Sequence, residues 1–357
     1  LHCHSNYSFQ EGASSIEELL VHAKELGYPA LALTDHDNLC GAMEFAGAAR
    51  SMGIQPIIGC EVTLQGGAHL TLLAATRDGY ANLCRLVTAA YVFGERKDPQ
   101  LDPALLADHA EGLVLLTGCA EGEVPSLIDQ GRLEKARKRL EEYREWFGAE
   151  NVYLELQQNL VHGDTNRIKA LVGLARELDL RTAATNNVHY HVRERHRLQD
   201  CLVAIKHNKS LEETHRERRP NSEFYLKSAE EMCALFAELP GAIGNTLRIV
   251  NQCSFDLSRD LGYSFPDYPA PEGHTQETYL EELCNQAAVR RYGAVTPQVE
   301  ERLAQEFRLI EKHNLAGFIL LYHEIIQLGR EVMVDLGLVD REVPIEEAPP
   351  GRGRGSS

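Results

Sequence analysis

Several features that mark common classes of protein are missing from this sequence. Its 357 residues contain no Cys-x-x-Cys pair and no apolar run of about 18 residues. No signal peptide is recognisable at the start of the chain. These absences argue against insertion in a membrane. The nine scattered cysteines predict reduced thiols in a cytoplasmic protein rather than a disulfide framework.

Positive charge is also scarce, since 53 acidic residues outnumber 36 basic ones and leave a formal net charge of −17. This chain alone is therefore not expected to hold nucleic acid on a broad basic surface, although a metal ion or a local basic strip can still receive a phosphate. One such strip could approach DNA in a longer parent protein, but a solvated loop explains it more simply. Its cations are Lys206, Lys209, Arg216, Arg218 and Arg219.

The first 190 residues alternate short apolar strands with amphipathic helices. About seven strands are predicted, at the initial “LHCH” and at 29–35, 55–62, 69–75, 112–119, 151–157 and 181–187. Such alternation predicts an α/β fold with a parallel sheet, either open or closed into a barrel. The first helix, within 14–27, is expected to begin with a capping box of Ser14 and Glu17.

The rhythm changes after about residue 200. A Pro-rich linker spans 264–275, and the helical patterns beyond it predict a second, mainly helical unit. The chain begins with Leu1 and ends in “GRGRGSS”, and both ends are expected to be cuts through a longer chain.

Metal-binding residue types gather at the ends of the predicted strands, where α/β folds place their sites. Each residue alone is a weak signal, but together they predict a metal centre. The candidates are His2, His4, Glu11, Asp35, His36, Glu61, His69, Cys119, Asn187 and His189. A mixture of imidazole, carboxylate and thiolate suits zinc, manganese or iron. Clustered ions activate water and bind a phosphoryl oxygen, as phosphoester hydrolysis requires.

These motifs resemble a known family. “LHCHSNYSFQEGAS”, “LALTDHDNLCGAMEF”, “IIGCEV”, “LLTGC” and “ATNNVHYH” are similar to the polymerase-and-histidinol-phosphatase (PHP) domain at the start of bacterial C-family DNA polymerases of the alpha-subunit type. “TNNVHY” and “YPAPEGHTQETYLEELC” resemble the error-prone branch most. The resemblance covers essentially the whole chain.

The resemblance implies a distorted seven-stranded (β/α) TIM-like barrel with three metal ions at the carboxyl ends of its strands. One ion would bind His2, His4, Glu61 and position 187. A second would share Glu61 with His69 and Cys119, and a third would bind Glu11, His36 and His189. The resemblance leaves Asp35 a supporting role outside the ligand set.

Asn187 departs from the pattern, because metal-competent members of the family carry aspartate there. An amide oxygen is a poorer ligand than a carboxylate and removes one negative charge from the ion's surroundings. This substitution would weaken the first ion without emptying its site, since His2, His4 and Glu61 remain.

The resemblance also implies a domain order: a PHP barrel over 1–205, a basic and helical extension over 206–264, and the start of a polymerase palm over 265–357. The terminal “PPGRGRGSS” resembles a palm loop that contacts nucleotide phosphates, with Gly353, Arg354, Gly355, Ser356 and Ser357 as its residues. The catalytic aspartates would lie further along, so this chain alone is not expected to polymerise DNA. The full-length parent would use magnesium, a DNA primer-template and other replication or translesion subunits.

Three functions remain open for this chain. The first is a multi-metal phosphoesterase, with a 3′→5′ exonuclease as its most specific form. The second is a catalytically weak scaffold, stabilised by metal, that supports the polymerase and binds its partner subunits. The third, a stand-alone phosphatase of the histidinol-phosphate kind, is disfavoured by the linker and the palm-like segment.

Overall fold

A computed structural model describes residues 1–94, 98–263 and 265–338. The chain forms two compact units, Leu1–Leu261 and a second one that begins at Gly262. The three-part division into 1–205, 206–264 and 265–357 stays a prediction, and the predicted phosphate loop at Gly353–Ser357 lies outside the described residues.

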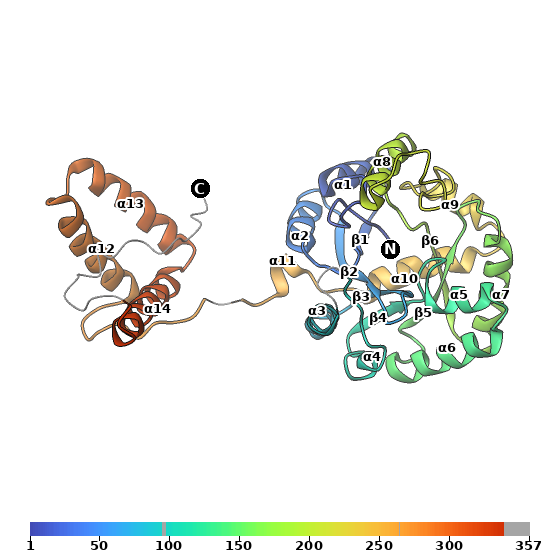
Figure 1. The fold of residues 1–357 in the computed structure, drawn as a ribbon, viewed down its shortest axis with the longest axis horizontal. Coiled ribbons are helices and arrows are strands. Elements are labelled where there is room, and N and C mark those ends of the chain that lie inside the picture. Colours follow the sequence, from blue (N-terminus) through green and yellow to red (C-terminus); the bar gives the residue numbers. More distant parts are fainter. Residues whose placement is uncertain (95–97, 264, 339–357) are drawn as a thin grey trace. The chain divides into compact units, whose positions relative to one another are not determined.

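The first unit is built on one curved sheet with helices outside it, so the expected α/β class is confirmed (Figure 1). The strands follow one another in the order β1-β2-β3-β4-β5-β6. Their bounds are Ala30–Leu33 (β1), Gln55–Thr63 (β2), His69–Ala74 (β3), Leu113–Leu116 (β4), Val152–Gln157 (β5) and Arg181–Thr185 (β6).

The direction of β3 differs from the expected all-parallel sheet. β3 pairs antiparallel with both β2 and β4, whereas the β1–β2, β4–β5 and β5–β6 pairs are parallel. Only residues 64–68 connect β2 to β3, and a parallel crossover needs a dozen or more residues. The short link therefore forces the reversal, and it pairs Thr63 with His69.

The initial “LHCH” does not form a regular strand but joins the two edges of the sheet. Cys3 makes a parallel bridge with Val188, just beyond β6. The Val188 N–H donates to the His2 carbonyl (3.0 Å), and on the other side the Thr34 N–H donates to the Cys3 carbonyl (2.8 Å) just beyond β1. The segment thus closes the curved sheet at the ends of β1 and β6.

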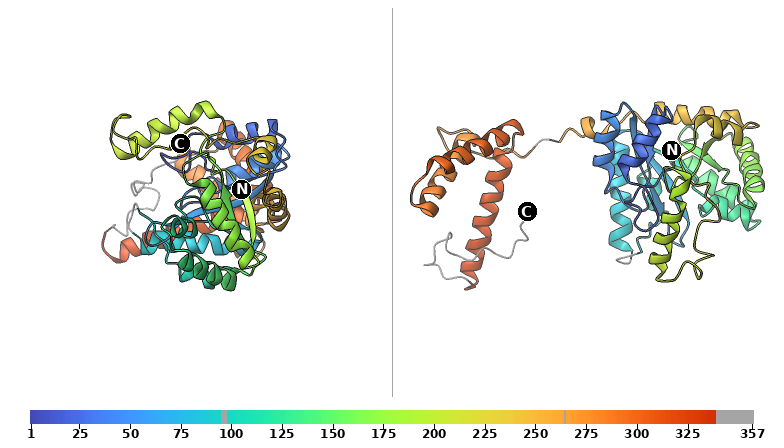
Figure 2. Two further views of the ribbon diagram at one scale, coloured as in Figure 1. Left: turned by 90° about the vertical axis from the view of Figure 1, so that its right-hand side faces the viewer. Right: turned by 90° about the horizontal axis from the view of Figure 1, so that it is seen from above.

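Helices surround the sheet in all three views (Figures 1 and 2). Those of the first unit are α1 (Ile16–Glu25), α2 (Ala42–Ser51), α3 (Arg77–Phe93), α4 (Leu105–Asp108), α5 (Glu123–Asp129), α6 (Leu133–Phe147), α7 (Asp164–Glu177), the 3-10 turn Arg193–Arg195, α8 (His196–His207), α9 (Ala229–Leu235), α10 (Pro240–Gln252) and α11 (Leu257–Asp260). The predicted capping box of α1 is off by one residue. Ser15, not Ser14, is the N-cap, and it exchanges hydrogen bonds with Glu18.

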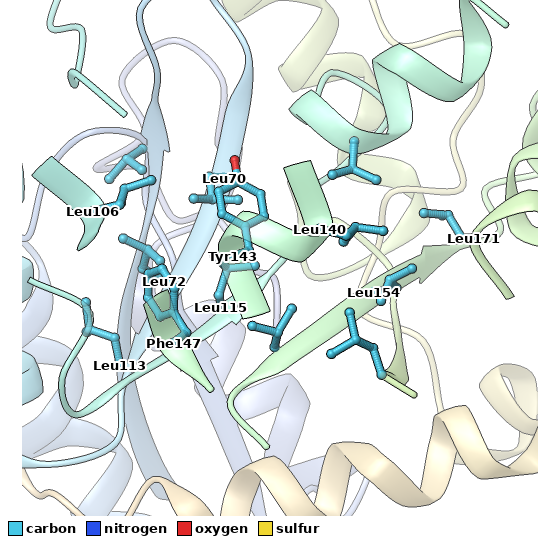
Figure 3. Close-up of a cluster of buried hydrophobic side chains, with 14 of the residues drawn as sticks. Leu70, Leu72, Leu106, Leu113, Leu115, Leu140, Tyr143, Phe147, Leu154 and Leu171 are labelled. Atoms are coloured by element: carbon cyan, nitrogen blue, oxygen red, sulfur yellow. The ribbon is translucent and has the colours of Figure 1, made fainter. Parts of the chain in front are cut away.

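Apolar side chains fill both faces of the sheet. The inner face is closed by residues from all six strands, mostly small or branched ones such as Ala32, Ile57 and Val114 but also Tyr153 of β5, together with Ile249 of α10. The outer face of β2–β5 packs against α3, α6 and α7, and Figure 3 shows part of this cluster, with Leu72 and Tyr143 among its labelled residues. These two layers fix the strand ends in space, and the candidate ligands are attached there.

The second unit contains three helices, α12 (Gln276–Tyr292), α13 (Pro297–Lys312) and α14 (Ala316–Asp335). Leu280, Ala316 and Leu320 form its small buried core. α14 also exposes several large apolar side chains, among them Ile325 and Val332. In both units, no helix among the described residues is both long and apolar enough to cross a membrane.

Candidate metal centre

The buried carboxylate of Glu61 is the centre of the site. It lies near the end of β2 and is 1% exposed. Its Oε2 is 3.2 Å from the Nε2 atoms of both His2 and His4 and 3.1 Å from Nε2 of His36, while its Oε1 is 3.4 Å from Nδ1 of His69. Four imidazoles from three segments of the chain therefore converge on one carboxyl group.

Within the described residues, three groups have ligand atoms close enough to hold an ion, and two of them share Glu61: His2, His4 and Glu61, and His36, Glu61 and His69. The reversed strand β3 explains the place of His69. His69 begins β3, but because β3 is antiparallel, its start lies at the same edge as the ends of the parallel strands.

Glu155 determines which nitrogen of His2 faces the centre. Its Oε1 is 2.7 Å from Nδ1 of His2, and a carboxylate can only accept a hydrogen bond, so Nδ1 carries a proton. The other nitrogen, Nε2, then points to Glu61 and can offer a lone pair to a metal ion. Glu155 is itself held by Gln157 and Thr185.

A second chain of hydrogen bonds runs from Asp35 through Ser8 to His4. Asp35 is 2% exposed and accepts hydrogen bonds from Ser5 and from the Ser8 hydroxyl (2.6 Å). Ser8 therefore has a lone pair for Nδ1 of His4 at 3.1 Å, which leaves Nε2 of His4 facing Glu61. Asp35 is placed where it orients a candidate ligand and lies outside the two groups.

Asn187 also reaches this part of the site. Its Oδ1 is 3.2 Å from Nε2 of His4, and its side chain is buried. Its backbone has a φ of 47°, in the left-handed region that asparagine tolerates well. The amide therefore stands beside the first group.

A further group extends the site toward β4. Nδ1 of His69 lies 3.8 Å from Sγ of Cys119 and 3.6 Å from Oε2 of Glu121, and these three residues form another arrangement with ion-binding spacing. Burial, followed by the charges of Glu61 and Glu121, raises the pKa of the Cys119 thiol well above its ordinary value. Cys119 therefore needs a bound cation to become a thiolate ligand.

Opposite charges balance one another in the rest of the site. Burial opposes the charged form of His2, but Glu155 and Glu61 overcome it and raise the pKa of His2 to about 10. Burial likewise opposes the charge on His36, yet Glu61 and Glu11 raise its pKa to about 9. Although burial disfavours the ionised form of Glu61 too, His2 and His36 hold the pKa of this carboxyl well below its ordinary value.

The chemistry of this donor set fits divalent cations. Neither carboxylate oxygen of Glu61, nor Nε2 of His2, makes a hydrogen bond within the described residues, although all three atoms are buried. Buried polar atoms without hydrogen bonds are costly unless an ion coordinates them. Imidazoles with a carboxylate and a thiol suit transition metals better than magnesium.

The third predicted set is arranged differently. Glu11 approaches His36 at 3.0 Å, but its other oxygen is paired with Lys206. Nε2 of His189 accepts a hydrogen bond from Nη2 of Arg219 at 2.6 Å. Glu11, His36 and His189 do not together form one of the groups with ion-binding spacing in the described residues.

Comparison with known proteins agrees with this geometry. Residues 1–159 match the model of the family described as the PHP domain. This part of the chain is a PHP domain.

The similarity of this PHP-domain chain to bacterial polymerases extends well beyond residue 159. It is 38% identical over 347 residues to an error-prone DNA polymerase of Symbiobacterium thermophilum, covering 93% of the chain and 32% of that protein. It is 35% identical over 372 residues to DNA polymerase III subunit alpha of Treponema pallidum, covering 100% of the chain and 31% of that protein. The predicted family is confirmed, and the chain spans about a third of the length of these relatives. Since both kinds of polymerase align, the error-prone branch stays a prediction.

Solved structures give a fainter likeness. A putative metal-dependent phosphoesterase from Bifidobacterium adolescentis aligns with a TM-score of 0.35 and 16% identity, over 53% of this chain and 86% of that one.

Sequence reasoning missed several residues that contact the candidate ligands, among them Glu155, Glu121 and Arg219. Glu155 had a signal, because a carboxylate inside the apolar run “NVYLELQ” must find a partner. Glu121 follows Cys119 by two residues but reads as an exposed loop residue. Arg219 was assigned to a basic strip, and only the fold brings that strip to His189.

Proposed function

We propose that this chain is part of a DNA-directed DNA polymerase and that its PHP domain hydrolyses phosphoesters with the help of two or more divalent ions. Zinc, manganese or iron would bind at the Glu61 cluster, with magnesium at the polymerase centre of the parent. Removal of nucleotides from the 3′ end of a primer is the most specific form of this activity. The sequence relatives support the polymerase parent, with a DNA primer-template, further replication or translesion subunits and a cytoplasmic location.

One observation carries the phosphoesterase proposal: four imidazoles surround a single buried carboxyl group whose oxygens make no hydrogen bonds within the described residues. Bound divalent ions would supply activated water and stabilise charge on a phosphoryl oxygen. The chain's own residues provide orientation. Glu155 and Asp35 hold the rings of His2 and His4 with Nε2 directed inward, so that little reorganisation accompanies binding.

The experiment combines metal analysis with an assay on a labelled primer. We expect at least two ions per chain and stepwise shortening of the primer from its 3′ end in manganese or zinc. His36→Ala and Glu61→Gln should lose both the ions and the hydrolysis, whereas His162→Ala, at an exposed histidine, should keep both. Zero or one ion with no hydrolysis would sink the proposal.

A metal-stabilised scaffold is the second candidate, and a different observation favours it. His2 and His4 flank the bridge by which Cys3 joins the two edges of the sheet, so an ion there would hold the fold closed. The amide of Asn187 beside His4 also favours weak catalysis. In this case chelation lowers the melting temperature, but the parent chain shows no hydrolysis with its ions bound.

A further inference from the structure

The end of α8 and the loop after it bring two cations close to the metal centre. Lys206 is in the last turn of α8, and Arg219 follows in the loop that leads to Phe224. The guanidinium of Arg219 lies over the Phe224 ring, 5.0 Å from its centre, which holds it in place. These two residues contact the members of the third predicted ion set.

The members of that set already interact with other protein side chains. Glu11 shares its carboxylate between Lys206 and His36. Arg219 is always protonated, so its N–H can only donate, and His189 must accept with Nε2. That bond uses the lone pair that a metal ion would need.

His36 is engaged elsewhere too. Its Nε2 is 3.1 Å from Oε2 of Glu61 and groups with Glu61 and His69. One nitrogen lone pair serves one ion, and Nε2 of His36 also lies 3.0 Å from Glu11, so His36 can join the third set only where Glu11 and His189 are free to bind an ion as well. The fixed positive charges of Lys206 beside Glu11 and of Arg219 beside His189 would further repel a divalent cation.

We propose that Lys206 and Arg219 take the place of the third metal ion, so that the PHP domain of this chain binds two ions and not three. The inference rests on the proposed function, because it presupposes ions at the Glu61 cluster. Lys206 and Arg219 act as positioning residues: they neutralise Glu11 and fix the ring of His189 without a metal ion.

The test counts ions per chain by equilibrium dialysis against excess manganese or zinc, followed by elemental analysis. The parent chain should hold two ions, and the double variant Lys206→Ala/Arg219→Ala should gain a third. Arg216→Ala removes an exposed cation from the same loop and should leave the count at two. Circular dichroism checks that each variant is folded.

The two proposals fail in different ways. Three ions in the parent chain would overturn the substitution by Lys206 and Arg219 and leave the phosphoesterase proposal standing. Fewer than two ions would overturn both. A folded double variant that still holds two ions would refute the role of the two cations. If the double variant does not fold, Lys206→Met/Arg219→Met replaces it, because methionine keeps most of the length of both side chains while removing their charge and their N–H donors, and a count of two would again refute the idea.

Discussion

Replacing Asn187 by aspartate should tighten metal binding at the first group. The new carboxylate would stand where the amide oxygen now lies, 3.2 Å from Nε2 of His4. The φ of 47° is in a region that asparagine and aspartate both tolerate, so the change adds little backbone strain. Only the charge of the side chain differs.

The expected magnitude follows from two opposing terms. Two unit charges about 4 Å apart attract by about 4 kcal/mol at an effective dielectric constant of about 20, and a divalent ion doubles this to about 8 kcal/mol. Burial of the carboxylate costs several kcal/mol, and repulsion from Glu61 reduces the gain further. A net gain on the order of 2 kcal/mol remains, which is about 30-fold in affinity.

Competition with a chelator of known affinity measures this change. Asn314→Asp is the matched control, since Asn314 also has a positive φ (52°) but is exposed and lies in the second unit. We expect tighter binding for Asn187→Asp and no change for Asn314→Asp. Equal metal dissociation constants for the parent chain and Asn187→Asp would refute position 187 as a ligand.

Three further predictions concern the centre and its support. Metal affinity should fall as the pH is lowered below about 10, because His2 and His36, with pKa values raised to about 10 and about 9, must release a proton before they can bind the ion. Calorimetry in buffers of different ionisation enthalpy counts these protons. Glu155→Gln should weaken metal binding by about 10- to 100-fold, since Nδ1 of His2 loses its carboxylate partner, and chelator competition measures this loss. Leu72→Ala should lower the free energy of unfolding by about 2–5 kcal/mol in urea, because this fully buried side chain would leave a cavity.

Each of these predictions can fail visibly. Metal binding without proton release would show that the two imidazoles are not displaced from their protonated state. An affinity unchanged by Glu155→Gln would remove the argument that this carboxylate prepares His2. The matched control for Leu72→Ala is Leu133→Ala, at a half-exposed position of α6, and equal losses of stability would contradict the packing argument.

Residues at the ends of regular elements were predictable from the sequence because strand ends follow directly from hydrophobic patterning. His36 and Glu61 each come immediately after or within an apolar run, and periodicity alone places them at one edge of a sheet. The reversal of β3 was not read from this pattern, because apolar runs look alike in parallel and antiparallel strands. The short link at 64–68 was its only local signal.

Contacts made by long side chains across the fold could not be predicted. Arg219 reaches His189, which is 30 residues away, through a loop whose path is set by tertiary packing. Lys206 meets Glu11 in the same way, and no spacing rule relates these positions. Sequence patterns therefore indicated which residues could bind metal ions. They did not indicate which of these residues would instead be paired with a lysine or an arginine of the protein.

The bridge at Cys3 has a consequence for how the first unit opens. The backbone amides of His4, Thr34 and Val188 are all protected by the hydrogen bonds that this segment makes, and two of the candidate ligands flank Cys3 itself. Local separation of the N-terminal segment from the ends of β1 and β6 would then occur together with release of the ion. The three amides should exchange their hydrogens with solvent together, slowly with ions bound and faster after chelation, while amides inside β5 keep their protection. Ion binding at the metal centre would thus stabilise the closed form of the curved sheet in addition to serving the chemistry of the site.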